Sequence, residues 1–229
     1  MLDRLRRLLP VVSLRTLDSV DAYSRWAATY PPCAHNALMH VEEAAMLDLM
    51  PPLAGRVVLD LACGTGRYSR LAAERGARLA LGLDNSPAML RASAQPLRGL
   101  AHIEALPLPA GAVDVVICGL ALGHLPAITP ALGEISRVLR PGGTALISDF
   151  HPFVFLSGGQ RTFVAPDGVT YAVEHYPHLY TDYHRAAHAT GLRIENVTEA
   201  VLPEAEAASL DHPEMPVVLV LCLGKTSSS

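Results

Sequence analysis

A glycine turn between two acidic residues has the residue types best suited to bind a small ligand. Gly64 and Gly66 follow the apolar run 55–61, which contains Asp60. Glycines at such a turn let a ligand approach the backbone, and the next helix begins with free N–H groups. Asp84 ends the next apolar run, where a carboxylate can accept two hydrogen bonds from a ribose diol. Taken alone, the glycine turn fits a structural turn as well as a site for a small ligand whose ribose would contact Asp84.

The same turn argues against a dinucleotide cofactor. A dinucleotide fingerprint has a third glycine, which permits close packing of helix on strand around a pyrophosphate. Here Arg67, Tyr68 and Ser69 follow Gly66, and the third glycine is missing. A nicotinamide-dependent oxidoreductase is therefore a weak alternative.

Histidine is the side chain best suited to act as a base at neutral pH. His151 follows the predicted strand 144–149, and His124 follows the predicted strand 113–118. Ligands collect at the carboxyl ends of such strands in open α/β sheets. We rank His151 first and His124 second as the catalytic base. The alternative for each is an ordinary exposed or hydrogen-bonded side chain.

The segment after residue 150 is predicted to face the acceptor. Its tyrosines between 171 and 183 can cap a pocket, because an aromatic ring buries apolar area and keeps a polar group. We assign His151, His178 and Tyr180 to acceptor binding. His184 and His188 lie one helical turn apart, but no carboxylate motif accompanies them, so no metal is predicted.

Alternating strands and helices must position these residues. Short apolar runs predict strands at 55–61, 77–83, 101–104, 113–118 and 144–149. Helical spacing, capping residues and Pro or Gly stops predict helices at 67–75, 86–94 and 130–139. This alternation gives a parallel sheet, so the predicted fold class is α/β, with a doubly wound Rossmann-like sheet.

The flanks of this core are predicted to cover the site. Two helices between 19 and 50, broken at Pro31 and Pro32, form a lid, and the turn 165–168 between β-prone stretches predicts a hairpin. A helix at 181–190 and strands at 192–198 and 216–223 complete the chain. A single domain of four parts is expected: lid 1–54, core 55–149, insertion 150–180 and C-terminal helix and strands 181–229.

The stretch 58–67, VLDLACGTGR, resembles the first motif of class I S-adenosylmethionine-dependent methyltransferases. The resemblance covers about 55–149 and implies a mostly parallel sheet with an antiparallel last strand. The stretch 23–30 resembles the segment whose tyrosines close over the cofactor in the small-molecule branch of that family. The residues implied to bind S-adenosylmethionine are Tyr23, Tyr30, Asp60, Ala62, Cys63, Gly64, Gly66, Asp84, Asn85, Met89, Glu104, Ala105 and Gly119.

The predicted adenine site departs from the family pattern. The stretch 101–107 resembles the segment that reads the adenine edge, but relatives usually carry Asp where this chain has His102. A neutral imidazole nitrogen could accept the same hydrogen bond, and the Ile103 amide could serve adenine N1. The departure supports a second hypothesis, in which the protein binds the cofactor for a structural role or a non-methylating reaction.

The composition argues against several other classes of function. The formal net charge is −4, which disfavours nucleic-acid binding, and no apolar run is long enough to span a bilayer. The cysteines Cys33, Cys63, Cys118 and Cys222 lack paired spacing and are expected to be reduced thiols in a cytoplasmic protein. Arg4, Arg6 and Arg7 are expected on a solvated helix.

The predicted reaction is methyl transfer to a small molecule, with oxygen of a hydroxyl or carboxylate as the preferred acceptor. Such an in-line displacement depends mainly on orientation. A base helps a hydroxyl acceptor and is unnecessary for a carboxylate. The oligomeric state is left open between monomer and homodimer.

Overall fold

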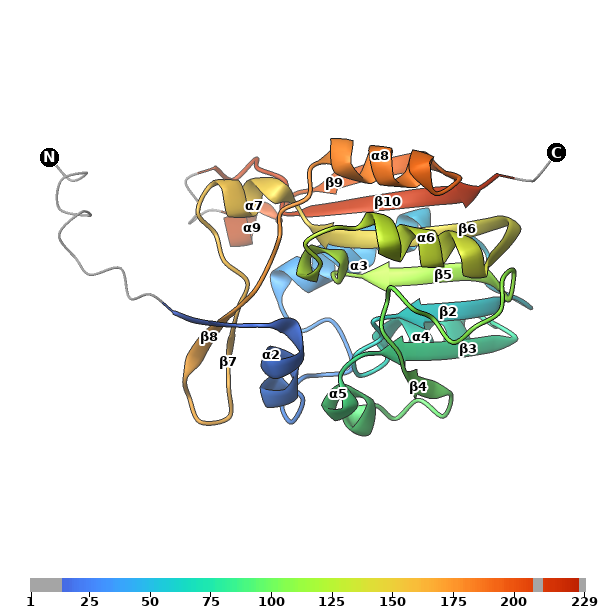
Figure 1. The fold of residues 1–229 in the computed structure, drawn as a ribbon. Helices are drawn as coiled ribbons and strands as arrows, with labels where there is room; N and C mark the ends of the chain where they lie inside the picture. Colours follow the sequence, from blue (N-terminus) through green and yellow to red (C-terminus); the bar gives the residue numbers. More distant parts are fainter. Residues whose placement is uncertain (1–13, 208–211, 227–229) are drawn as a thin grey trace, which may run out of the picture.

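The computed structural model describes residues 14–207 and 212–226; Arg4, Arg6 and Arg7 lie outside them (Figure 1). The first half of the chain contains β1 Arg15–Leu17, α2 Ser19–Trp26, α3 Ala37–Leu49, β2 Val57–Leu61, α4 Arg67–Glu74, β3 Leu79–Asp84, α5 Pro87–Ala92, β4 Arg98–Leu100 and β5 Val113–Gly119. The second half contains η1 Leu122–His124, α6 Thr129–Val138, β6 Leu139–Phe150, α7 Pro152–Leu156, β7 Thr162–Val164, β8 Thr170–Val173, α8 Tyr180–Ala189, β9 Leu192–Ala200, α9 Glu204–Ala207 and β10 Val218–Lys225.

A seven-stranded sheet in the order β4-β3-β2-β5-β6-β10-β9 forms the centre of the molecule. The pairs from β4 to β6 are parallel, and β10 runs antiparallel to both of its neighbours. The predicted α/β class with a mostly parallel sheet and an antiparallel last strand is confirmed.

Strand residues alternate between two hydrophobic cores, because successive side chains point to opposite faces of a sheet. Val58 packs in the core that contains Met46 of α3 and Leu71 of α4. Leu59 packs in the other core, which contains Leu132 of α6 and Ala186 of α8. Helices therefore cover both faces, as Figure 1 shows, and the functional surface is left at the strand ends.

The turn after β4 corrects one prediction. Residues 101–104 were expected to form a strand, but β4 ends at Leu100. The chain then turns tightly, with the Ala105 N–H donating to the His102 carbonyl at 3.0 Å. Ile103 is the one β-branched residue in that stretch, so its preference for a strand is weak.

The predicted hairpin is present as β7 and β8, and β1 adds a third strand that pairs in parallel with β8. This small sheet and α2 share a hydrophobic cluster that includes Leu17, Phe163 and Tyr171, with Trp26 packed against it. In Figure 1 they lie beyond the carboxyl ends of β2, β3 and β5. Neither β1 nor α7 was anticipated from the sequence.

Three further observations bear on the sequence expectations. No helix in the described ranges is long and apolar enough to cross a bilayer. The four cysteines are free thiols, and Cys63 and Cys118 are buried. Residues 14–207 and 212–226 contain no group of three or more His, Cys, Asp or Glu side chains placed to hold a metal ion.

Candidate active site

A cavity opens where β2, β3 and β5 end, and α2 covers it. It encloses about 990 Å³ of space, including a part that is open to solvent. It lies at the edge of the sheet where ligands bind in open α/β folds.

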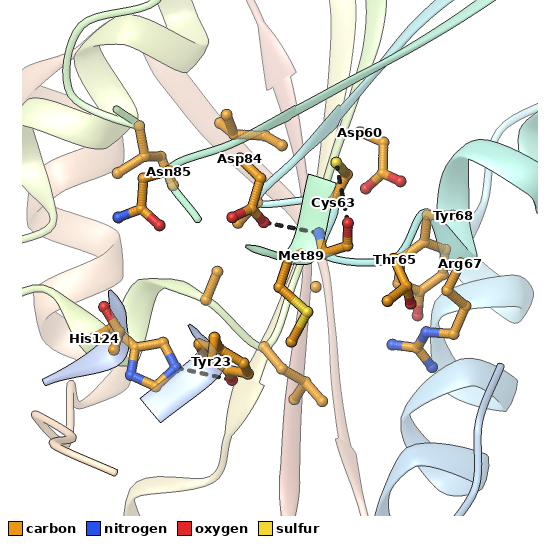
Figure 2. Close-up of a pocket in the computed structure, with 18 of the residues that line it drawn as sticks. Tyr23, Asp60, Cys63, Thr65, Arg67, Tyr68, Asp84, Asn85, Met89 and His124 are labelled. Carbon is orange, nitrogen blue, oxygen red and sulfur yellow. Dashed lines mark hydrogen bonds between the residues drawn. The ribbon is translucent and has the colours of Figure 1, made fainter. Parts of the chain in front are cut away.

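Asp84 fixes the glycine turn at one side of the cavity (Figure 2). Its Oδ2 atom accepts the Gly64 N–H at 2.7 Å, and its Oδ1 atom accepts the Ser86 N–H at 2.7 Å. Gly64 has φ +55°, a conformation that glycine adopts without steric cost. Because a carboxylate has about four acceptor positions, Asp84 keeps capacity for a ligand's hydroxyl groups.

Asp60 at the end of β2 holds the start of α4. Its Oδ2 atom accepts the Ser69 N–H at 2.6 Å and the Ser69 hydroxyl at 2.7 Å. Its Oδ1 atom has no hydrogen-bond partner among the described residues, and Asp60 lines the cavity. Burial raises the pKa of Asp60 to about 7. A cationic ligand group beside Oδ1 would favour the ionised form.

A buried ion pair forms the wall opposite Asp84. The Arg67 guanidinium donates to Glu42 of α3 at 2.6 Å, and the Tyr68 hydroxyl donates to the same carboxylate at 2.7 Å. Glu42 is completely buried, and the Ser148 hydroxyl also donates to it. This network ties α3 to α4 and β6 directly behind the glycine turn.

Tyr23 and His124 lie together at another side of the cavity, as Figure 2 shows. His124 Nδ1 lies 2.9 Å from the Glu174 carbonyl oxygen, which can only accept, so Nδ1 carries the hydrogen. The Tyr23 hydroxyl then donates to Nε2 at 3.3 Å. Burial lowers the pKa of His124 to about 3, and burial raises the pKa of Tyr23. Both side chains are uncharged at neutral pH.

Arg161, just before β7, is a cavity residue that the sequence did not reveal. Its Nη1 atom donates to the Leu120 carbonyl at 2.8 Å. Its guanidinium lies over the Phe150 ring at 4.9 Å and over the Tyr23 ring at 5.8 Å. No motif surrounds Arg161 in the sequence, so only the folding of the insertion over the strand ends could identify it.

The structure brings most of the predicted cofactor residues to one cavity. Those that line it are Tyr23, Tyr30, Asp60, Ala62, Cys63, Gly64, Asp84, Asn85, Met89 and Gly119, together with the predicted base His124. Those placed elsewhere are Gly66, Glu104, Ala105, His151, His178 and Tyr180. Ile103, whose amide was expected at adenine N1, also lines the cavity, whereas Arg67, Tyr68, Leu125 and Arg161 are among the cavity residues that were not predicted.

His151 is placed away from the cavity for a local structural reason. Its Nδ1 atom accepts the Phe153 N–H at 3.3 Å, which caps α7, and its Nε2 atom lies 3.2 Å from Glu199 Oε1. Both ring nitrogens therefore have protein partners outside the cavity. Of the two predicted bases, His124 lines the cavity and His151 does not, so the placement favours His124.

The other predicted acceptor residues also have protein contacts or solvent around them. His178 donates from Nε2 to the Leu125 carbonyl at 2.8 Å. Tyr180 begins α8 and is exposed. His102 is likewise exposed, whereas its neighbours Ala101 and Ile103 line the cavity. The apolar side chains at that turn, and not the imidazole, form this part of the wall.

The cavity fits the chemical groups of S-adenosylmethionine. The free Oδ1 of Asp60 suits an ammonium group, and Asp84 suits a ribose diol. Met89, Ile103 and Leu125 give an apolar surface suited to a flat base. An acid, a diol acceptor and an apolar slot lie in one cavity at the ends of neighbouring parallel strands.

Part of the sequence is similar to known methyltransferases. Residues 59–147 match the family model of the methyltransferase domain. A malonyl-(acyl-carrier protein) O-methyltransferase from Serratia marcescens is 38% identical over 134 residues, which make up 56% of this chain and 51% of that protein. The chain spans about half the length of the curated relatives it matches.

Solved structures show the same fold. An S-adenosylmethionine-dependent methyltransferase from Mesorhizobium loti has a TM-score of 0.67 at 22% identity, covering 80% of this chain and 97% of that one. A geranyl diphosphate C-methyltransferase from Streptomyces coelicolor, solved with S-adenosyl-L-homocysteine, has a TM-score of 0.63 at 17% identity, covering 90% and 97%. The fold of this chain is therefore that of S-adenosylmethionine-dependent methyltransferases, and its residues 59–147 match the methyltransferase domain.

Proposed function

We propose that this protein transfers a methyl group from S-adenosylmethionine to an oxygen atom of a small-molecule acceptor. The observation that carries the proposal is the hydrogen bond from the Gly64 N–H to Asp84, which fixes the glycine turn and the ribose acid in one cavity. The relative from Serratia marcescens is named an O-methyltransferase, and this supports oxygen as the acceptor atom.

Each side of the cavity has a distinct role in this proposal. Asp84 accepts hydrogen bonds from the ribose, and the free Oδ1 of Asp60 pairs with the ammonium group of the amino-acid end. S-adenosylmethionine supplies an activated methyl group on its sulfonium sulfur. Tyr23, Leu120 and His124 border the space left for the acceptor.

Orientation and exclusion of water are the main contributions expected from this chain. Holding the acceptor in line with the methyl group supplies much of the rate acceleration in such a displacement. His124 is a weak base, because its pKa is lowered to about 3 and a good general base has a pKa near the working pH. The cavity therefore suits an acceptor oxygen that is already ionised.

Isothermal titration with S-adenosylmethionine, S-adenosylhomocysteine and NADH tests the cofactor assignment. Both adenosyl ligands should bind and NADH should not. Asp84→Ala should weaken adenosyl binding about 100-fold, because hydrogen bonds to a charged group contribute about 1.5–3 kcal/mol each. The matched control Glu74→Ala removes an exposed carboxylate and should leave the affinity unchanged.

The outcomes separate the three hypotheses. If neither adenosyl ligand binds, the methyltransferase proposal is wrong. If NADH binds in their place, the nicotinamide alternative holds. If S-adenosylmethionine binds but no S-adenosylhomocysteine forms with any hydroxyl or carboxylate acceptor, the non-methylating alternative is favoured.

A further inference from the structure

Two arginines line the cavity, and they differ in how their charge is compensated. Arg67 pairs with Glu42 at 2.6 Å and with Glu43 at 3.5 Å. Among residues 14–207 and 212–226, no carboxylate lies within ion-pairing distance of Arg161. Burial raises the pKa of Asp149 and the charge of Arg161 lowers it in part, but the two side chains form no ion pair. The cavity thus contains one arginine in an ion pair and one that forms none with a described residue.

Arg161 is nevertheless well buried, with 8% of its surface exposed. Its contacts are the Leu120 carbonyl and the faces of the Phe150 and Tyr23 rings. A neutral carbonyl and two aromatic faces compensate a buried cation less well than an acid does. A buried arginine in this wall is explained if the cavity binds an anion.

The guanidinium also keeps donors available. It has five N–H donors, and only Nη1 forms a hydrogen bond with a described residue. Nε and Nη2 are not among the polar atoms that are both sealed from solvent and unpartnered. Because Arg161 lines the cavity, these nitrogens remain accessible to a ligand beside Tyr23 and His124.

We propose that Arg161 binds a carboxylate of the methyl acceptor, so that the substrates of this enzyme are small carboxylic acids. This inference rests on the proposed function and deepens it. A planar guanidinium is suited to bind a carboxylate through paired hydrogen bonds. The aromatic faces of Tyr23 and Phe150 would hold it in the required orientation.

The net charge of the cofactor does not neutralise the positive charge of Arg161. S-adenosylmethionine carries a sulfonium and an ammonium group against one carboxylate, so its net charge is positive. In Figure 2, Asp60 and the pair Tyr23 and His124 lie at opposite sides of the view. An anionic acceptor supplies the missing negative charge, and a carboxylate needs no base because it is ionised at neutral pH.

The test compares benzoate with its neutral analogue benzamide on protein saturated with S-adenosylhomocysteine. Titration calorimetry gives both affinities. Trp26 fluorescence is a second readout, because Trp26 is the one tryptophan in the chain and its ring stacks on Tyr23 with centroids 6.0 Å apart. We expect benzoate to bind at least about tenfold more tightly than benzamide.

Variants then show whether Arg161 causes the preference for benzoate over benzamide. Arg161→Met should remove this preference, while the affinity for S-adenosylhomocysteine stays within about twofold. Arg161→Lys should keep part of the preference, because the positive charge remains. Arg193→Met is the matched control, since it removes an exposed arginine charge and should leave the preference as in the wild type.

Each other result overturns the inference. Equal binding of benzoate and benzamide to the wild-type protein would do so without any variant, even if Arg161→Met fails to fold. A preference that survives in Arg161→Met places the anion elsewhere. Loss of S-adenosylhomocysteine affinity in a folded Arg161→Met would assign Arg161 to the cofactor. If the wild-type protein binds no S-adenosylhomocysteine, the proposed function itself fails, and this inference fails with it.

Discussion

The two sides of the cavity are built by different means. On the cofactor side, Asp60 and Asp84 lie in β2 and β3 of the central sheet, and backbone N–H groups fix their carboxylates at 2.6–2.7 Å. On the acceptor side, Tyr23 and Arg161 are positioned mainly by ring contacts, and those residues belong to α2 and the insertion. The cofactor side is part of the sheet, whereas the acceptor side combines Leu120 and His124, which follow β5, with a layer laid over the strand ends.

This difference determines which residues can change without altering the rest of the cavity. Parallel strands that end together place Asp60, Gly64 and Asp84 within one small region, so their geometry follows from the sheet itself. The acceptor side has its own small cluster around Phe163 and Tyr171. Residues in that cluster can change without moving the strand ends, which suits a surface that determines acceptor specificity.

The largest expected effect is on the network behind the cofactor side. Glu42→Ala leaves the Arg67 charge buried without its closest partner, and breaking such a pair costs about 3–5 kcal/mol of unfolding free energy. Urea denaturation followed by circular dichroism measures it. Glu74→Ala breaks the exposed Arg70–Glu74 pair and should cost less than about 0.5 kcal/mol. Equal losses in the two variants would show that the buried network contributes no special stability.

Next in size is a change confined to the acceptor side. Phe163 is buried and stacks on Trp26 with centroids 4.9 Å apart. Phe163→Ala should destabilise this layer by about 3 kcal/mol. Amide hydrogen exchange should speed up in residues 15–26 and 162–173, while β2, β3 and S-adenosylhomocysteine binding stay as in the wild type. Faster exchange throughout the central sheet would show that the two sides unfold as one unit.

The sequence was sufficient to predict the part of the cofactor side formed by the glycine turn and the two acids, but not the turn at residues 101–105. A strand, a glycine turn and an acid after the next strand are local signals, and the sheet places Asp60, Gly64 and Asp84 together as expected. Ser86 caps α5 through the Met89 N–H, a local contact that its position also predicted. These predictions succeeded because each depends on a few consecutive residues and on the alternation of strands and helices.

The acceptor side could not be predicted in the same way. His151 follows a strand end just as the sequence suggested, but its side chain turns to cap α7, a helix with no clear sequence signal. Arg161 enters the cavity because β8 pairs with both β7 and β1, and β1 lies far from them in the sequence. Such placement depends on long-range pairing, to which residue type and spacing give no guide.

A smaller effect is expected from mild acid, about one pH unit below 6.5, on the acceptor side. Burial holds the pKa of His124 at about 3, against 6.5 for a free imidazole, so the unfolded chain binds a proton that the folded chain does not. His124 therefore stabilises the fold above pH 6.5, and this contribution is lost as the pH falls from 6.5 toward 3. The contribution of Asp60 to stability has the opposite dependence on pH. It decreases as the pH rises from 3.8 to about 7, because the pKa of Asp60 is raised on folding. The difference in unfolding free energy between the wild type and His124→Gln isolates the histidine and should shrink as the pH falls; a difference independent of pH would contradict the shift.

The smallest expected effect is that of His151→Ala, although the sequence ranked His151 first as the base. The variant loses the cap on α7 and should cost about 0.5–2 kcal/mol of stability, as lost helix caps do. Because both imidazole nitrogens have partners outside the cavity, methyl transfer to a carboxylate acceptor should keep its kcat within about twofold. Tyr23→Phe is the comparison, since it removes the hydroxyl that contacts His124 inside the cavity and should lower kcat/KM more. A loss of kcat of about 100-fold or more in His151→Ala is on the order that removal of a general base produces. Such a loss would show that His151 is the general base and that α7 rearranges when the acceptor binds.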